Sequence, residues 1–432
     1  MGIEIEFFEP HMPEVVMTGR LFIDQDGKDY FEFWGDMNDC FRVFKVVFAV
    51  AVDSDEKYTL VNCFFKQSNF GSYRFIINEL YKGDYIDKVT ESNCIGAEAR
   101  MTGLTNWINN PRIKPEIRFL TSEQGKVIVK EFFTKSFIIT DNITLELCEF
   151  CEENYSRNET VLRNMSYVKF IANMPVSRLE LYKNTTAFLK FLSLFTDDLP
   201  QFTRLNYSFS KEKHVEYFGS SQLKETAENE ALLTFDLLEV YCKKALELFY
   251  RDRDKYVKVL DLLNASIKNN TSEISFLNIT TAFEVVHKFF YEKDNEETRK
   301  GLHDELLKAG LIKRATKKWE QVIRYHHLFK LTESIDFVKQ NFVNPLKTID
   351  LIRESRNYYT HYSDTEKEIW TPNRLLYANK ALRQLLKAVI LKQLLLPNEL
   401  VNKLLNNKAA FFYHDYKKNE YSHNYLDAIN KK

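Results

Sequence analysis

Glycine is scarce in this chain, with only 12 among 432 residues. The sequence contains no G-x-x-x-x-G-K-[ST], no G-x-G-x-x-G and no G-x-S-x-G segment. These patterns form the phosphate loop of P-loop NTPases, the dinucleotide-binding turn of Rossmann enzymes and the nucleophile elbow of α/β-hydrolases. The sequence therefore disfavours an ATPase, a Rossmann oxidoreductase and a lipase-type hydrolase.

Cysteine is also sparse, and its spacing does not indicate a metal site. The six cysteines are Cys40, Cys63, Cys94, Cys148, Cys151 and Cys242. They are too few for a disulfide scaffold in a chain of this length, so we expect reduced thiols. The single C-x-x-C at residues 148–151 lacks the second pair of a structural zinc site, although other cysteines could converge with it in the fold. His326 and His327 are adjacent on a predicted helix and point about 100° apart, which disfavours a shared metal.

Neither a dominant charge nor a long hydrophobic run is present. Lys and Arg number 60 against 61 Asp and Glu, so any surface for nucleic acid must be local. No apolar stretch reaches the roughly 18 to 20 residues that span a bilayer, and the start MGIEIEFFEP is not a basic leader. We expect a soluble, cytoplasmic protein without a membrane partner. The apolar content of 44% is ample for at least two buried cores in a chain of two or three domains.

Residues 1–205 have the pattern of an antiparallel β-rich domain. Short runs with alternating polarity, such as GRLFIDQDGKDYFEFWG and VFKVVFAVAV, recur between turn signals. β-Branched and aromatic residues are frequent in them, and a D-G pair lies at residues 26–27, which favours strands joined by hairpins. Short helices are expected near residues 101–109 and 178–195.

Beyond about residue 222 the hydrophobic period changes from two to 3.6. Leu, Ile and Phe recur at i, i+3, i+4 and i+7 through segments such as ISFLNITTAFEVVHKFFYEK and PNRLLYANKALRQLLKAVILKQLLL. Pro345 after Asn344 and Pro372 after Thr371 mark two helix starts. We predict an all-α bundle over residues 222–400, followed by a C-terminal tail at 401–432. The fold class is α+β.

The segment RESRNYYTHYSD, near the end of one predicted helix, contains the candidate catalytic residues. Arg356 is a permanent cation that can bind a phosphate, and His361 is suited to proton transfer near neutral pH. Asn357 directly follows the arginine, giving the spacing R-N-x-x-x-H. The less functional alternative is that Arg356 and His361 cap helix carbonyls and pair with Glu354 or Asp364.

Helix geometry separates the two motif side chains. Five residues at about 100° each place Arg356 and His361 roughly 140° apart, with a rise of about 7.5 Å. Either the last turn loosens before Tyr362, or a second copy of the chain supplies the facing residues across a twofold axis.

The R-N-x-x-x-H motif, in this helical context, resembles the HEPN family of helical ribonucleases. The resemblance implies a homodimer whose paired motifs line one cleft, and a further carboxylate from an earlier helix. Glu284, within the apolar stretch TTAFEVVHKFF, is the candidate carboxylate. The alternative is that Glu284 lies at the edge of the buried stripe and meets water or a lysine.

RNA carries its own nucleophile, so this motif would need neither metal nor cofactor. His361 would act as general acid or base, Arg356 would stabilise the phosphorane-like transition state, and Asn357 would orient the histidine or a phosphate oxygen. The expected products are a cyclic phosphate and a 5′-hydroxyl.

Two further features could bind RNA. Tyr358 and Tyr362, with the intervening Tyr359, could stack on bases, or at least two of the three could pack in the bundle. A basic segment could follow a phosphate backbone, or could be solvated surface. Its charges include Lys313, Arg314, Lys317 and Lys318.

Taken together, the helical half resembles the Apea-like branch of HEPN domains, and the β-rich half resembles the N-terminal domain that accompanies it in anti-phage proteins. The resemblance implies an abortive-infection toxin, in which the β-rich half senses or restrains and the helical half cuts tRNA, rRNA or mRNA. A phage-derived trigger is a possible partner. The alternative is a non-catalytic RNA-binding or scaffold protein that keeps a HEPN-like dimerisation bundle.

Overall fold

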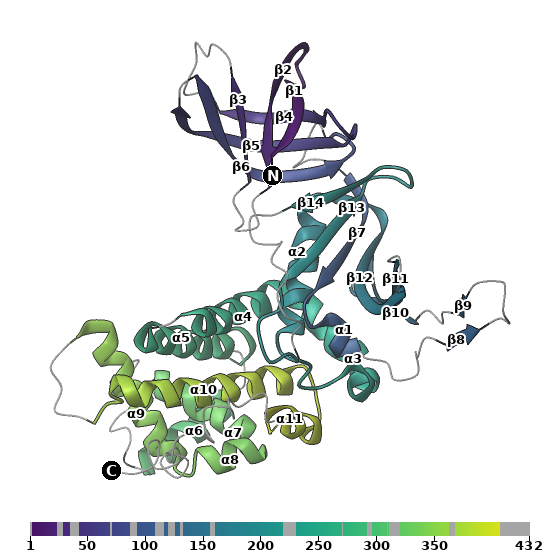
Figure 1. The fold of residues 1–432 in the computed structure, drawn as a ribbon. Helices are drawn as coiled ribbons and strands as arrows, with labels where there is room; N and C mark the ends of the chain where they lie inside the picture. The colour runs from purple at the N-terminus through teal and green to yellow at the C-terminus, as the bar shows by residue number, and fades with distance from the viewer. Residues whose placement is uncertain are drawn as a thin grey trace. The chain divides into compact units, whose positions relative to one another are not determined.

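A computed structural model describes residues 2–23, 29–34, 43–69, 71–86, 93–108, 116–119, 126–129, 133–155, 160–218, 230–269, 271–291, 296–308, 310, 320–362 and 368–406. The chain divides into two units. One, here called the N-terminal domain, comprises Met1–Leu192 with Pro200–Asn229. The other, the helical domain, comprises Ser193–Leu199 with Glu230–Lys432. Figure 1 labels the elements of both.

The N-terminal domain is built around one large antiparallel sheet, as the alternating pattern predicts. Its strands run in the order β10-β11-β12-β7-β13-β14-β6-β3-β2-β1-β4-β5. A separate ladder joins β8 (Glu116–Phe119) to β9 (Lys126–Val129). The sheet strands are β1 (Ile3–Glu9), β2 (Met12–Phe22), β3 (Tyr30–Trp34), β4 (Phe44–Ala51), β5 (Lys57–Asn69), β6 (Ser72–Gly83), β7 (Asn93–Met101), β10 (Phe133–Ile138), β11 (Ile143–Tyr155), β12 (Thr160–Ser177), β13 (Phe202–Ser208) and β14 (His214–Phe218).

The first six strands close into a barrel, because β5 pairs with β6 as well as with β4. Period-two alternation produces its core: in β1, Ile5 and Phe7 point inward and are buried, while Glu4 and Glu6 alternate with them and are exposed. Phe7 packs edge-on against Phe31, and Phe31 stacks on Phe75, with ring centroids 5.3 Å apart in both pairs. Closure leaves this part of the sheet without an open edge.

Strand β6 is shared between the barrel and the rest of the sheet. Its last residues pair with β14, where Gly83 has a φ of +121°. A Cβ at this position would lie 2.6 Å from the carbonyl oxygen of His214, so only glycine allows the two strands to approach here. Beyond β14, the sheet packs against α1 (Leu104–Ile108) and α2 (Arg178–Leu192), and Trp107 packs against Phe188 and Phe191.

The helical domain follows the 3.6-residue period. Its helices are α3 (Phe235–Arg251), α4 (Arg253–Lys268), α5 (Ser272–Phe290), α6 (Glu296–Lys308), α7 (Glu320–Thr332), α8 (Asp336–Asn341), α9 (Pro345–His361), α10 (Pro372–Gln393) and α11 (Asn398–Leu405). Both proline-marked starts are confirmed, with Asn344 and Thr371 as the N-caps of α9 and α10. No helix in the described part of the chain is long and apolar enough to cross a membrane.

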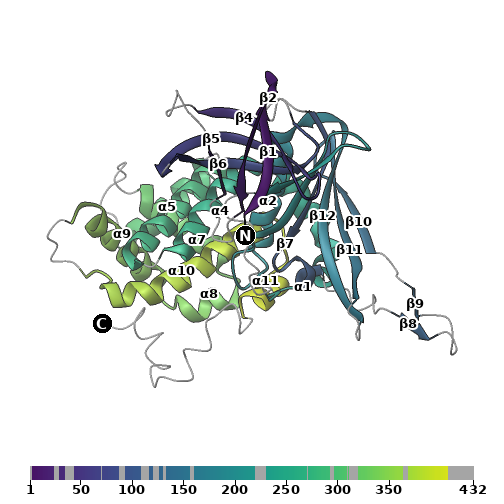
Figure 2. The ribbon, with the colours of Figure 1, turned by 45° about the horizontal axis from the view of Figure 1, so that its top comes forward.

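Helix α10 forms the centre of the helical domain. It is 22 residues long, and most of its second half is buried on all sides, from Leu385 to Leu391. It packs against α5, α7 and α11, while α9 packs against both α5 and α7. Figures 1 and 2 show α10 in yellow-green, running the length of this domain. The meeting of α5, α7 and α9 positions the candidate site.

Candidate active site

Helix α9 presents the R-N-x-x-x-H motif, and both of its ends are fixed. At the start, the side chain of Asn344 accepts a hydrogen bond of 3.1 Å from the backbone N–H of Lys347. Near the end, the backbone N–H of Trp370 donates to Ser355 Oγ at 2.8 Å, and Tyr359 Oη donates to the carbonyl of Trp370 at 2.8 Å. The last turns of α9 are therefore held against the segment that leads into α10.

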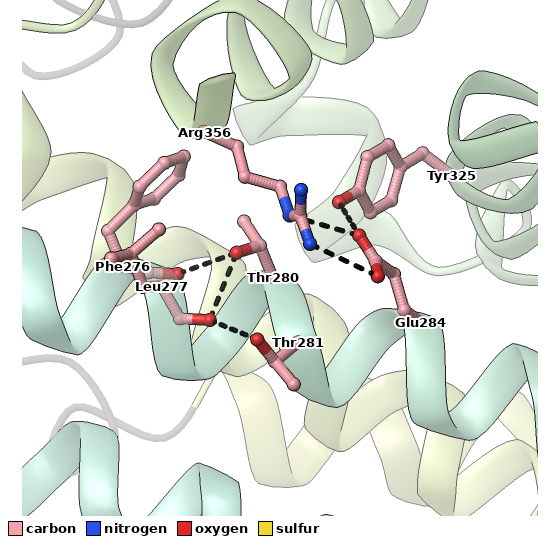
Figure 3. A network of polar contacts seen from close by, with 7 residues as sticks. All are labelled: Phe276, Leu277, Thr280, Thr281, Glu284, Tyr325 and Arg356. Atoms are coloured by element: carbon pink, nitrogen blue, oxygen red, sulfur yellow. Dashed lines mark hydrogen bonds and ion pairs between the residues drawn. The ribbon is translucent and has the colours of Figure 1, made fainter. Parts of the chain in front are cut away.

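Arg356 forms a two-point ion pair with Glu284 of α5. Arg356 Nε lies 3.0 Å from Glu284 Oε1, and Nη2 donates to Oε2 at 3.3 Å. The side chains are 22% and 18% exposed, so the pair lies at the boundary between core and solvent. Figure 3 shows Arg356 reaching from α9 to meet Glu284 on α5. Glu284 was the carboxylate expected from sequence, and its partner is this arginine rather than a lysine.

Tyr325 of α7 is a third member of this network that sequence reasoning did not identify. Its hydroxyl donates to Glu284 Oε1 at 3.1 Å, and the side chain is 1% exposed (Figure 3). Burial, and then the adjacent Glu284 carboxylate, raise the pKa of Tyr325 well above its usual value. The phenol therefore stays protonated and acts as a donor. A tyrosine within an apolar helical stripe has no sequence feature that separates it from ordinary core.

The threonines of α5 beside this network do not compete for the same charges. Thr280 donates to the carbonyls of Phe276 and Leu277, each at 3.1 Å, and Thr281 donates to Leu277 at 2.7 Å. Both hydroxyls thus return to their own helix, as Figure 3 shows. Glu284 is consequently the acceptor that holds Arg356 among the described residues.

His361 is the last residue of α9, and it is exposed. Tyr362 follows in the left-handed region, with φ 47° and ψ 36°, and its N–H donates to the carbonyl of Tyr358 at 2.5 Å. The helix therefore stays regular through His361, and the alternative of a loosened last turn is wrong. One copy of α9 leaves Arg356 and His361 on different sides of the helix.

The motif tyrosines differ in exposure. Tyr359 is 5% exposed, and its ring lies edge-on to Phe276. Tyr362 is 72% exposed. Tyr358 is intermediate in exposure, and its ring lies edge-on to the rings of Tyr359 and Tyr362. Asn357 is also partly exposed. Tyr358, Tyr362, Asn357 and His361 are thus accessible from solvent, whereas Tyr359 belongs to the core.

The four basic residues predicted to contact RNA lie outside the described part of the chain: Lys313, Arg314, Lys317 and Lys318.

The adjacent histidines of α7 contact different helices, as their angular separation predicts. His326 Nε2 lies 2.9 Å from Glu305 Oε2 of α6, whereas His327 Nδ1 lies 3.2 Å from His287 Nε2 of α5. Within the described ranges, no three His, Cys, Asp or Glu side chains gather closely enough to share a metal ion. Cys63, Cys94, Cys148 and Cys242 are buried.

Two family models match the chain. Residues 6–249 match the model described as ApeA N-terminal domain 1, which covers more than half of the sequence. Residues 277–400 match the model described as Apea-like HEPN, and this range contains Glu284, Tyr325, Arg356 and His361. No curated protein and no solved structure matches the chain.

Proposed function

The chain belongs to the ApeA family, with an ApeA N-terminal domain joined to an Apea-like HEPN domain, and on this premise we propose that it is a metal-independent endoribonuclease of anti-phage defence. The HEPN match supports a nuclease-type defence function in general. The observation that carries the finer proposal is the placement of Arg356, which α5 and α7 hold at the core boundary five residues before an exposed His361.

Arg356 supplies the positive charge of the proposed reaction. Because Nε and Nη2 face Glu284, the Nη1 group has no hydrogen-bond partner among the described residues. It can donate to a non-bridging phosphate oxygen, where negative charge increases as the phosphorane-like transition state forms. A guanidinium that is already fixed in place needs little reorganisation at that moment.

His361 performs the proton transfers in this proposal. A ribose 2′-hydroxyl loses its proton, attacks the adjacent phosphorus, and displaces the 5′-oxygen, which takes up a proton. The products are a 2′,3′-cyclic phosphate and a 5′-hydroxyl, without a metal-activated water or another cofactor. Asn357 orients the imidazole or a phosphate oxygen, while Tyr358 and Tyr362 offer ring faces to unpaired bases. Lys313, Arg314, Lys317 and Lys318 guide the backbone of the RNA.

The complete site requires two copies of the chain. HEPN domains typically dimerise and act on RNA. In one copy the regular α9 directs Arg356 and His361 roughly 140° apart, so both cannot face one phosphate. A twofold axis beside the end of α9 brings Arg356 of one copy toward the second copy's motif.

In this scheme the N-terminal domain senses a trigger or restrains the helical domain. A phage-derived trigger would relieve the restraint, and cytoplasmic tRNA, rRNA or mRNA would then be cut, halting translation in the infected cell. A non-catalytic RNA-binding or scaffold role is the alternative, and it makes opposite predictions for the motif variants.

The direct test is cleavage of total RNA in EDTA, with sequencing of the new 5′ ends. Wild-type protein should generate 5′-hydroxyl ends, and Arg356→Ala and His361→Ala should abolish both the ends and toxicity in cells. His11→Ala, which removes a largely exposed histidine of the N-terminal domain, is the matched control and should retain activity. Equal behaviour of wild type and both motif variants would leave only the scaffold role.

Complementation tests the two-copy site. Arg356→Ala and His361→Ala proteins are purified separately, dissociated, and mixed to form heterodimers. One site of each heterodimer then combines the intact Arg356 of one copy with the intact His361 of the other, so about half of the wild-type activity per heterodimer should return. If each chain used its own pair, every site in the mixture would be defective and no activity would return.

A further inference from the structure

The buried hydroxyl of Tyr325 is not part of the motif but contacts Glu284, which in turn holds Arg356 of the motif. It comes from α7, whereas Glu284 is on α5 and Arg356 is on α9, so one carboxylate joins three helices. The aromatic ring is fixed independently of the hydroxyl, because it packs edge-on against Phe283 at a centroid distance of 6.2 Å. Removal of the hydroxyl alone should therefore leave the packing intact.

The donors divide between the two oxygens of Glu284. Oε1 faces both Arg356 Nε, at 3.0 Å, and the hydroxyl of Tyr325, at 3.1 Å, while Oε2 accepts from Arg356 Nη2. A carboxylate held by the arginine alone could rotate together with the guanidinium. The third donor, from a rigid and separate helix, fixes the plane of the carboxylate and hence the plane of the guanidinium.

We propose that Tyr325 is a positioning residue of the ribonuclease site, which acts through Glu284 to aim the Nη1 edge of Arg356, the edge turned away from Glu284, at the scissile phosphate. This inference rests on the proposed function. Tyr325 itself touches no substrate, because it is almost completely buried. Glu284 likewise acts by holding the arginine, since its oxygens already face three donors, and not as the base that accepts the 2′-hydroxyl proton.

The chain contains a matched network for use as a control. In the N-terminal domain, the hydroxyl of the fully buried Tyr81 donates to Glu79, and Arg178 Nη2 lies 3.3 Å from the same carboxylate. Tyr81→Phe therefore deletes the same kind of hydrogen bond from a tyrosine, glutamate and arginine network outside the HEPN match. It measures what the loss costs in stability without affecting Arg356.

The test compares Tyr325→Phe with Tyr81→Phe and wild type in steady-state RNA cleavage. Tyr325→Phe should lower kcat about tenfold and leave KM within about twofold. The reason is that a misaligned arginine weakens stabilisation of the transition state more than it weakens binding of the substrate. Tyr81→Phe should cleave like wild type. Both variants should show similar small decreases in Tm.

A second comparison tests whether the tyrosine acts through Glu284. In single-turnover cleavage, adding Tyr325→Phe to Glu284→Ala, which removes the acceptor altogether, should slow the reaction much less than it slows wild type. Full wild-type activity of Tyr325→Phe, an equal loss in both tyrosine variants, or full additivity with Glu284→Ala would each overturn the inference. If wild-type protein does not cleave RNA at all, the proposed function itself fails, which is a distinct result.

Discussion

The ion pair between Glu284 and Arg356 should contribute measurably to the stability of the helical domain. The perturbation is a double-mutant cycle of Glu284→Gln, Arg356→Met and the combined variant. Glutamine keeps an acceptor for Tyr325, and methionine keeps part of the arginine stem, so the cycle isolates the interaction between the charges.

The expected magnitude follows from distance and exposure. Unit charges about 4 Å apart attract by about 1 kcal/mol in water and by about 4 kcal/mol at an effective dielectric constant of about 20. The closest contact is 3.0 Å, and the two side chains are 22% and 18% exposed, so the pair is neither fully solvated nor fully buried. After the desolvation cost, we expect a coupling free energy of about 2 kcal/mol.

The assay is urea unfolding followed by far-UV circular dichroism, which reports mainly on the helices, at low salt and at 1 M salt. A partly buried pair should keep most of its coupling at high salt, whereas a solvent-exposed pair is screened. A coupling below about 0.5 kcal/mol, or one that disappears at 1 M salt, would show that α5 does not hold the arginine and would refute the positioning role of Glu284.

Three further predictions concern stability, each measured by urea unfolding. Burial lowers the pKa of Lys387 from 10.5 to about 8, so the unfolded state binds more protons between these values and stability should rise with pH from about 8 to 10.5. Lys387→Met should lose this rise, and its free energy of unfolding at pH 7 should exceed that of wild type by up to about 3 kcal/mol, since one pKa unit corresponds to about 1.4 kcal/mol. Equal stability of the two proteins at pH 7 would contradict this prediction. Burial raises the pKa of Glu149 from 4.5 to about 6, so the contribution of Glu149 to the free energy of unfolding should fall as pH rises through this window. Glu149→Gln should therefore be more stable than wild type at pH 7, by up to about 2 kcal/mol, but not at pH 4.5. Asn344→Ala should lower the free energy of unfolding by about 1 kcal/mol through loss of the α9 cap. Asn344→Ser should keep most of this stabilisation, because serine is also a good N-cap.

Local patterns were sufficient to predict the fold class of each half. In β1 the alternation of glutamate with Ile5 and Phe7 already determines which side chains enter the barrel. Pro345 after Asn344 likewise indicates where α9 begins. These features depend on neighbours within a few residues, which is why they could be predicted. Closure of the barrel through β5 and β6 was not predicted, because strand pairing joins segments whose proximity no local period encodes.

For the candidate site, the sequence contained the motif but not its surroundings. Glu284 could be proposed from its position in an apolar stripe, yet its partner is 72 residues away on another helix. Tyr325 could not be proposed, because a buried tyrosine that packs and one that donates to a carboxylate occupy the same position in a 3.6-residue pattern.

By itself, the sequence determined the β-rich and all-α character of the two halves, the start of α9, and the presence of an arginine and a histidine five positions apart. Only the tertiary structure decided that the helix stays regular through His361, and that α5 and α7 converge on Arg356. The physical reason is range: helix periods and caps are set by neighbours in the chain, whereas the direction of a guanidinium depends on charges and hydroxyls that packing brings from distant helices.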